Sequence, residues 1–569
     1  MKMKCSQVLM ECLLEQGVDT VFGYPGGTIL NIYDEFELHG YKEKIRHILT
    51  AHEQGASHAA DGYARSTGKV GVCFATSGPG ATNLTTGIAT AYYDSSPTVF
   101  ITCNVSENLI GKDSFQEVDI TGITMPITKC NYLVKDPNAL ADIVREAFAI
   151  ARSGRPGPVL IDIAKNVTAT EVDYEYLPLS EHASHGRLAN LLRRSSHDLK
   201  TPEPDHGDID KLLAMIEEAE KPLVLVGGGV IRSKGAVPEF RKFFERLNAP
   251  VASTIMGGGA CPGNHRLFTG MIGMHGSHAS NLAADNCDLL IAIGCRFSDR
   301  VATDPETFAK QAKIVQIDID RAEVDKNVPT DHHIIGDARR VLELLNGKLP
   351  AHDYPEWKEF VFSHKEVPLK VDGILHPHEI LETIQAVTGG DAIIATDVGQ
   401  HQMWSAQYYH FSRPGQLITS GGFGTMGFGL GAAMGAKLGN PDKVVVQCTG
   451  DGCFRMNCHE LATVEHYDIP IITVIFDNGT LGMVRQWQNL IYGKRFSQTD
   501  LDRGPDFVKL AEAYGVAGYR AKNQAEFEAA FRKAVESGKA AVIDCAIDID
   551  AMVHPMVPGG APVTNFVLD

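Results

Sequence analysis

Two polar residues near the end of the chain have types and spacing that suit a metal and phosphate site. Asp451 lies in a Gly450-Asp451-Gly452 turn after an apolar run, and Asn478 follows the next apolar run. If both runs are parallel strands joined by a helix, both side chains lie at the carboxyl edge of one sheet, where open α/β sheets bind ligands. A carboxylate, an amide oxygen and a backbone carbonyl suit Mg²⁺, and glycines let backbone N–H groups approach phosphate oxygens. Because D-G alone is a common turn, the prediction depends on the spacing and on the DNGTLGMV continuation.

The elements that must position these residues are strands that alternate with helices. Buried parallel strands are typically apolar without alternation, and alternating strands and helices indicate the α/β class. We therefore predict three doubly wound parallel-sheet domains. The clearest strand-like runs are GPVLIDIA (157–164), KPLVLVGGG (221–229), CDLLIAIG (287–294), KIVQIDID (313–320), DAIIATD (391–397), KVVVQCTGDG (443–452) and PIITVIFDN (470–478).

The strand and helix alternation stops in three places. Residues 169–208 are rich in His, Ser, Pro and charges, and residues 346–372 are mixed and polar, so both are predicted linkers. The tail 550–569 holds too much Pro and Gly for regular structure. The predicted domains are residues 1–168, 209–345 and 373–549.

Composition excludes several classes of protein. The chain has 569 residues, of which 44% are hydrophobic and 21% are charged, with a net charge of −18. This acidic balance disfavours nucleic acid and anionic membranes as partners, and no run approaches the about 20 apolar residues of a membrane span. The 12 cysteines include no C-x-x-C pair, which indicates reduced thiols. Glu11 and Glu15 interrupt any signal-peptide core. We expect a soluble cytoplasmic protein.

The N-terminal part carries motifs that complement the Asp451 turn. They are HEQGA (52–56), HAADGYAR (58–65) and ATSGPGATN (75–83). Together with the later GDG and Asn478, they resemble the acetolactate synthase family of thiamine-diphosphate enzymes. The resemblance covers nearly the whole chain and is weakest over 169–208. It implies a pyrimidine-binding domain, a central FAD-type domain and a domain that binds the diphosphate and Mg²⁺.

The resemblance implies that Glu53 activates the cofactor. Its carboxyl group would bond the aminopyrimidine ring and favour the imino tautomer that takes the C2 proton, whereas an arbitrary Glu is usually a surface residue. Met426 matches an apolar wedge under the thiazolium ring, although a lone Met is usually core packing. The implied metal ligands are Asp451, Asn478 and Thr480. The other implied thiamine-diphosphate contacts are Pro25, Gly26, Asn83, Val398, Gly399, Gln400, His401, Gly424, Gly452, Cys453, Leu481, Gly482 and Met483.

The central domain resembles the family's FAD-binding domain, although its Gly227-Gly228-Gly229 run is not a dinucleotide fingerprint. The resemblance lies in GMHGS (273–277), GCRFSDR (294–300), QIDID (316–320) and GDA (336–338). Ser298 departs from it, since an acidic residue is usual there. FAD in this family is usually structural. Its implied contacts here are Arg155, Gly228, Thr254, Ile255, Gly273, Met274, His275, Gly294, Arg296, Asp318, Ile319 and Asp337.

Two side chains match the family's acceptor site. Arg300 would bind the carboxylate of the second 2-keto acid, which a planar guanidinium suits, and Trp487 in GMVRQWQ (482–488) would contact its alkyl group. Without the resemblance, a salt-bridged arginine and a buried tryptophan are the commoner interpretations. Gln116 and Lys165 match further residues of the same cleft. This pattern favours the biosynthetic, flavin-containing branch.

The reaction implied by the resemblance is decarboxylation of pyruvate and transfer of its two-carbon unit to pyruvate or 2-ketobutyrate. The products, 2-acetolactate and 2-aceto-2-hydroxybutyrate, lead to branched-chain amino acids. A pyruvate oxidase, a 2-keto acid decarboxylase and a non-catalytic paralogue remain alternatives, and Glu53, Asp451 and Asn478 together argue against the last. The family builds each site from two subunits, so we expect a homodimer or a dimer of dimers. Whether a separate small regulatory subunit binds stays open.

Overall fold

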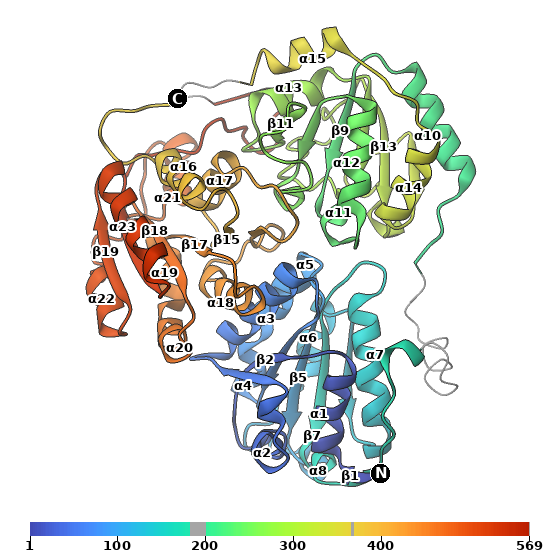
Figure 1. Cartoon of the computed structure of the whole chain (residues 1–569), viewed down its shortest axis with the longest axis vertical. Helices are drawn as coiled ribbons and strands as arrows, with labels where there is room; N and C mark the ends of the chain where they lie inside the picture. Colours follow the sequence, from blue (N-terminus) through green and yellow to red (C-terminus); the bar gives the residue numbers. More distant parts are fainter. Residues whose placement is uncertain (183–200, 366–368, 568–569) are drawn as a thin grey trace.

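The computed structural model describes residues 1–182, 201–365 and 369–567. It contains three six-stranded sheets, each parallel throughout, and one small two-stranded sheet. Figure 1 shows the three sheets with their helices, coloured blue, green and orange-red along the chain. The predicted α/β class with three parallel sheets is confirmed.

The first sheet has the strand order β3-β2-β4-β5-β7-β6. Every residue of β4, β5 and β7 is buried, which explains why their sequences are largely apolar without alternation. The strands are β2 (Thr20–Tyr24), β3 (Arg46–Leu49), β4 (Gly71–Ala75), β5 (Thr98–Asn104), β6 (Cys130–Val134) and β7 (Val159–Ala164). The main covering helices are α1 (Cys5–Glu15), α3 (Glu53–Thr67), α5 (Thr85–Tyr93) and α7 (Leu140–Arg152). Strand β1 (Lys2–Lys4) pairs antiparallel with β8 (Glu171–Asp173).

The central sheet has the order β11-β10-β9-β12-β13-β14. Its strands are β9 (Pro222–Val226), β10 (Val251–Ser253), β11 (Phe268–Met271), β12 (Leu289–Ile293), β13 (Lys313–Asp318) and β14 (His332–Ile335). Its helices include α10 (His206–Glu218), α12 (Ala236–Leu247), α13 (His278–Asn286) and α14 (Ala338–Lys348). A further helix, α15 (Pro355–Phe362), lies within 346–372, and its Trp357 joins the central core and donates to the Pro222 carbonyl at 2.9 Å.

The third sheet has the order β16-β15-β17-β18-β20-β19. Strands β17 and β18 run parallel with Gly450 opposite Phe476, so Asp451 and Asn478 lie at the same edge, as the spacing predicts. The strands are β15 (Ile393–Thr396), β16 (Leu417–Ile418), β17 (Val445–Gly450), β18 (Ile471–Asp477), β19 (Ala517–Ala521) and β20 (Ala541–Ala546). The helices include α16 (Pro377–Val387), α17 (Gln400–Tyr408), α18 (Gly429–Gly439), α19 (Asp451–Asn457), α20 (Leu461–His466), α21 (Gly482–Leu490), α22 (Phe507–Ala513) and α23 (Gln524–Ser537).

Helices α3 and α18 join the first and third sheets into one body (Figure 1). Glycines make this packing close, because a Cβ at Gly62 would overlap Ala432 and a Cβ at Gly435 would overlap Ala59. The two domains therefore share an apolar core cluster.

The tail after β20 ties the third domain to the central one. Val557 N–H donates to the Met274 carbonyl at 2.7 Å, and Val563 is buried in the central core. As far as residue 567, the tail is irregular as expected apart from an isolated bridge between Met556 and Val567. In the part of the chain that the structure describes, no helix is long and apolar enough to cross a bilayer. The domain and linker bounds given above stay predictions.

Candidate functional site

The predicted thiamine-diphosphate and cleft residues of the first domain lie at the carboxyl edge of its sheet, whereas Arg155 precedes β7 and lies at the opposite edge. Pro25 and Gly26 follow β2, the Thr76 to Asn83 segment follows β4, and Lys165 directly follows β7. Gly26 has no room for a side chain, because a Cβ there would lie 2.5 Å from the Thr76 side chain. This edge is where open α/β sheets bind ligands.

Glu53 is held in a defined buried position at the start of α3. Its side chain is 9% exposed, and its Oε2 accepts from Asn83 Nδ2 at 2.9 Å. His52 caps the helix, since its Nδ1 accepts from Gln54 N–H at 3.0 Å. A Cβ at Gly80 would lie 3.1 Å from Glu53 Oε1, so a side chain at residue 80 would crowd that oxygen. Asn83, which the sequence assigned to cofactor contact, thus touches Glu53 directly.

The loop with Gln116 is a tight turn on the same edge. Glu117 accepts backbone N–H groups of Gly111, Ser114 and Lys112, and these bonds lower its pKa. Gln116 has a φ of 61°, and its backbone approaches Gly78 so closely that a Cβ there would lie 2.9 Å from the Gln116 carbonyl. Phe115 is left 87% exposed.

Asp451 and Asn478 are both buried at the edge of the third sheet. Burial and then the neighbouring Asp477 carboxylate raise the pKa of Asp451 to about 7. Asn478 Nδ2 donates to Gln400 Oε1 at 3.1 Å, so its Oδ1 lies opposite, where it accepts Thr480 N–H at 3.3 Å. No group of three His, Cys, Asp or Glu within the described ranges could hold a metal alone. Besides the Asp451 carboxylate, a cation here would depend on amide and main-chain oxygens and on ligand phosphates, as Mg²⁺ commonly does.

His401 adds an unsatisfied group next to the Asp451 turn. It is buried, burial lowers its pKa to about 3, and its Nε2 has no hydrogen-bond partner among the described residues. A Cβ at Gly450 would lie 3.0 Å from its Nδ1. Cys453 Sγ donates to the Val398 carbonyl at 3.1 Å, and Leu481 and Met426 lie against Gly452. A buried polar atom that lacks a partner requires one, and a phosphate oxygen fits.

A cavity of about 930 Å³ lies where the three domains meet. Most of the predicted FAD residues and several predicted thiazolium and acceptor residues line it. They are Arg155, Gly228, Thr254, Ile255, Met274, His275, Gly294, Arg296, Asp318, Ile319, Asp337, Val398, Gly399, Gly424, Met483, Arg300 and Trp487. Gly273 lies just behind the wall, where a Cβ would overlap the Arg300 carbonyl. Glu53, Gln116, Lys165 and Asp451 do not line the cavity.

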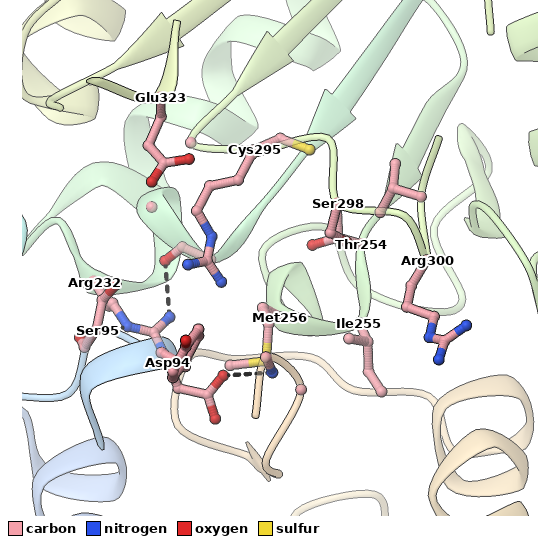
Figure 2. A pocket seen from close by; sticks show the side chains of 18 of the residues that line it. Asp94, Ser95, Arg232, Thr254, Ile255, Met256, Cys295, Ser298, Arg300 and Glu323 are labelled. Atoms are coloured by element: carbon pink, nitrogen blue, oxygen red, sulfur yellow. Dashed lines mark hydrogen bonds between the residues drawn. The ribbon is translucent and has the colours of Figure 1, made fainter. Parts of the chain in front are cut away.

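Arg232 is a cavity residue that the sequence reasoning missed. Its guanidinium donates to the carbonyls of Ser95 and Gly228 at 2.9 and 3.2 Å (Figure 2). No carboxylate within the described ranges forms an ion pair with it, and burial lowers its pKa to about 10, so it stays charged at neutral pH. The signal was available, because this cation lies three residues after the Gly227-Gly228-Gly229 run.

Two other arginines of the cavity differ from Arg232, since Arg155 is paired and Arg300 is exposed. Arg155 forms an ion pair with Glu323 at 2.6 Å and donates to Ser95 Oγ at 2.8 Å. Arg300 points away from Arg232 in Figure 2, and its side chain is 63% exposed. Burial raises the pKa of Asp318 to about 6.

Asp94 positions the glycine-rich loop before Met426, which sequence reasoning also missed. Its Oδ1 accepts Gly422 N–H at 2.7 Å (Figure 2), and its Oδ2 accepts from Arg65 at 3.0 Å. Arg65 also forms an ion pair with Asp61 at 2.6 Å. The first domain therefore holds the loop that carries Gly424.

Comparisons with known proteins agree with this architecture. Three family models match: "Thiamine pyrophosphate enzyme, N-terminal TPP binding domain" over residues 3–123, the central domain over 209–345, and the C-terminal TPP binding domain over 397–545. The chain is 46% identical to the "Probable acetolactate synthase large subunit" of Methanocaldococcus jannaschii, over 99% of this chain and 95% of that protein. It is 45% identical to the "Acetolactate synthase large subunit" of Lactococcus lactis, over 98% and 94%. The Haemophilus influenzae protein of the same name is 42% identical, over 100% and 98%.

Proposed function

The chain belongs to the acetolactate synthase large subunits, a family of thiamine pyrophosphate enzymes, and from this premise we propose how its residues perform the reaction. The enzyme decarboxylates pyruvate and joins the two-carbon unit to a second 2-keto acid, which gives 2-acetolactate from two pyruvates. The observation that carries the assignment of roles is the meeting of the three domains at one cavity lined by Arg300 and Trp487.

Thiamine diphosphate supplies a nucleophilic carbon and an electron sink for the decarboxylation. The unsatisfied His401 Nε2 and the glycine turn at 450–452 support diphosphate binding there. Asp451, Asn478 and the Thr480 main chain would hold Mg²⁺ against the diphosphate, since these oxygens suit a hard cation. Met426, beside Gly452, would support the thiazolium ring.

Glu53 would exchange a proton with the ring nitrogen of the aminopyrimidine. Asn83 holds one carboxyl oxygen at 2.9 Å, so the other is presented past Gly80. A buried, oriented carboxyl group is the arrangement that general acid and base catalysis requires.

FAD would occupy the cavity on the side of the central domain. A volume of about 930 Å³ suits a large ligand. Arg232, which forms no ion pair among the described residues, can neutralise a phosphate, and Gly228 and Gly294 line the same cavity. FAD has a structural role in this proposal and undergoes no net redox change.

Arg300 and Trp487 would select the acceptor. The exposed guanidinium would bind the carboxylate of pyruvate or 2-ketobutyrate, and the indole would contact the alkyl group. Gln116 and Lys165 lie outside this cavity in the single chain. We propose that a second copy brings them to it.

We propose a homodimer, alone or as half of a tetramer. In it, Gln116 and Lys165 of one chain would meet the cavity of the other. The first domain exposes Phe115 and Met125 at 87% and 67%, and Leu109 and Ile123 are also exposed. Exposed apolar groups of this kind mark interaction surfaces. A separate small regulatory subunit is a further proposed partner, as the name of the relatives implies.

An anaerobic flavin assay tests the proposed role of FAD. The protein loaded with thiamine diphosphate, Mg²⁺ and FAD is mixed with pyruvate while the flavin absorbance near its visible maximum is followed. We expect carboligation without stoichiometric bleaching. Rapid stoichiometric bleaching would instead indicate a pyruvate oxidase and overturn the structural role of FAD.

A further inference from the structure

Glu460 is a buried carboxylate of the third domain that binds the first domain next to Glu53. It ends the 3-10 turn η8 (Cys458–Glu460), which follows α19, and its side chain is fully buried. Its Oε2 accepts Ala51 N–H at 3.0 Å and the Thr463 hydroxyl at 2.6 Å, and its Oε1 accepts His52 N–H at 3.0 Å. Burial raises the pKa of Glu460, whereas these three bonds lower it.

These bonds fix the turn that leads into α3. Residues 50–52 lie between β3 and α3, and the N–H groups of Ala51 and His52 bond to Glu460. Two residues before Ala51, Leu49 N–H donates to the hydroxyl of Tyr467, another residue of the third domain, at 2.9 Å. The third domain therefore holds the main chain on the N-terminal side of Glu53.

The first turn of α3 also packs directly on the Glu460 carboxylate. A Cβ at Gly55 would overlap Glu460 Oε1, so glycine is required for this approach. The contact combines two charge-assisted bonds to backbone N–H groups with close packing of Gly55 against the carboxylate. Charge-assisted bonds of this kind are about twice as strong as neutral ones.

We propose that Glu460 is a positioning residue that sets where the Glu53 carboxyl group lies; this inference rests on the proton-transfer role proposed for Glu53. Glu460 contacts the main chain at residues 51 and 52, and it acts through that main chain. Effects on catalysis should then pass through Glu53 alone. If Glu460 only held the two domains together, its substitution would change stability and leave proton transfer unchanged.

The test is Glu460→Gln in the full-length chain. The amide keeps the size but replaces one acceptor oxygen with an N–H group that faces backbone donors. Without cofactor, we expect faster amide hydrogen exchange at Ala51 and His52. With thiamine diphosphate and Mg²⁺, the C2 proton exchange rate, measured by quenched deuterium exchange and NMR, should fall about 10²-fold, as for a displaced catalytic group. The dissociation constant of thiamine diphosphate should not change.

Two further variants make the result decisive. Glu465→Gln changes an exposed carboxylate of α20 and should leave every readout unchanged. Thr463→Val removes one donor to Glu460 while the ion stays bonded to the backbone, so it should slow C2 exchange less than Glu460→Gln does. It decides the question if Glu460→Gln does not fold.

A double-mutant cycle with Glu53→Gln separates positioning from an independent role. If Glu460 acts through Glu53, Glu460→Gln has no further effect on C2 exchange in the Glu53→Gln background. Additive losses, or wild-type exchange in both Glu460→Gln and Thr463→Val, would overturn the positioning role alone. Wild-type exchange in Glu53→Gln would overturn the proposed role of Glu53, and the positioning role with it.

Discussion

Glu53 and Asp451 are acids in equivalent places, each just beyond a strand at the carboxyl edge of its sheet, yet their surroundings differ. Glu53 has the Asn83 amide as its partner, whereas Asp451 has the like-charged Asp477 beside it. An amide orients a carboxyl group, and a second carboxylate attracts a cation or a proton. The neighbours therefore support a proton-transfer role for Glu53 and a metal role for Asp451.

Substitution of Glu53 tests the first of these roles. Glu53→Gln keeps the size and the bond from Asn83 but cannot exchange the proton. We expect turnover to fall by about 10²–10⁴, the usual effect of losing a general acid or base, with the melting temperature unchanged. Steady-state kinetics and calorimetry measure both. Turnover near that of the wild type would remove Glu53 from the mechanism.

Substitution of Trp487 tests the acceptor site. Ketobutyrate exceeds pyruvate by one methylene, and a hydrophobic contact can reward that difference by about 1–3 kcal/mol, or 10–200-fold. Trp487→Leu should reduce the preference for ketobutyrate, while activity with pyruvate alone largely survives. Competition between the two acceptors at a fixed ratio gives the product ratio. Val484→Ala, an exposed change on the same helix, is the matched control. An unchanged product ratio in the Trp487 variant would show that Trp487 does not contact the acceptor and only packs within its loop.

At the scale of elements, the middle of α21 connects the predicted metal loop to the tail. Gln400 accepts from Asn478 at 3.1 Å and donates to Gln486 Oε1 at 3.0 Å. Gln486 Oε1 also accepts Val553 N–H at 2.9 Å, and its Nε2 donates to the Val553 carbonyl at 3.1 Å. This chain of amide hydrogen bonds fixes the positions of α17, α21 and the tail relative to one another.

Gly482 is the position in this network with the least room for a side chain. A Cβ there would overlap Gln400 Oε1 and lie 2.6 Å from Asn478 Nδ2. Gly482→Ala should displace Asn478 and raise the Mg²⁺ concentration for half-maximal activity by at least about 10-fold, a loss of about 1.4 kcal/mol. Gly347→Ala, in α14 with open space around it, is the control. A Mg²⁺ titration that matches the wild type would show that Asn478 does not bind the metal.

The sequence predicted the strands well because buried parallel strands are marked by largely apolar runs without alternation, as in β7 and β18. It predicted which edge holds Asp451 and Asn478, because that follows from strand direction. It could not predict features that depend on distant partners. The core role of Trp357, the Arg232 bonds across the domain boundary and the Glu460 contact all join residues far apart in the chain.

At the scale of the whole molecule, the proposed site needs two chains, and mixing inactive variants tests this. Asp451→Ala should lose activity because the diphosphate loses its Mg²⁺ bridge. When Glu53→Gln and Asp451→Ala chains are mixed after dissociation and allowed to reassociate, each heterodimer contains one intact shared site.

A random one-to-one mixture would therefore recover about a quarter of wild-type activity, since half of the dimers have one good site of two. The same mixture without dissociation is the control. If each site lay within one chain, the mixture would stay inactive, and the proposed shared site would be wrong.

The central claim is that this molecule joins two 2-keto acids, and product identity tests it most directly. The full-length protein is incubated with pyruvate, thiamine diphosphate, Mg²⁺ and FAD, and all products are quantified by chromatography and NMR. The account predicts 2-acetolactate, with one CO₂ released for every two pyruvates consumed. Acetaldehyde with one CO₂ per pyruvate, or acetate with reduced flavin, would contradict it.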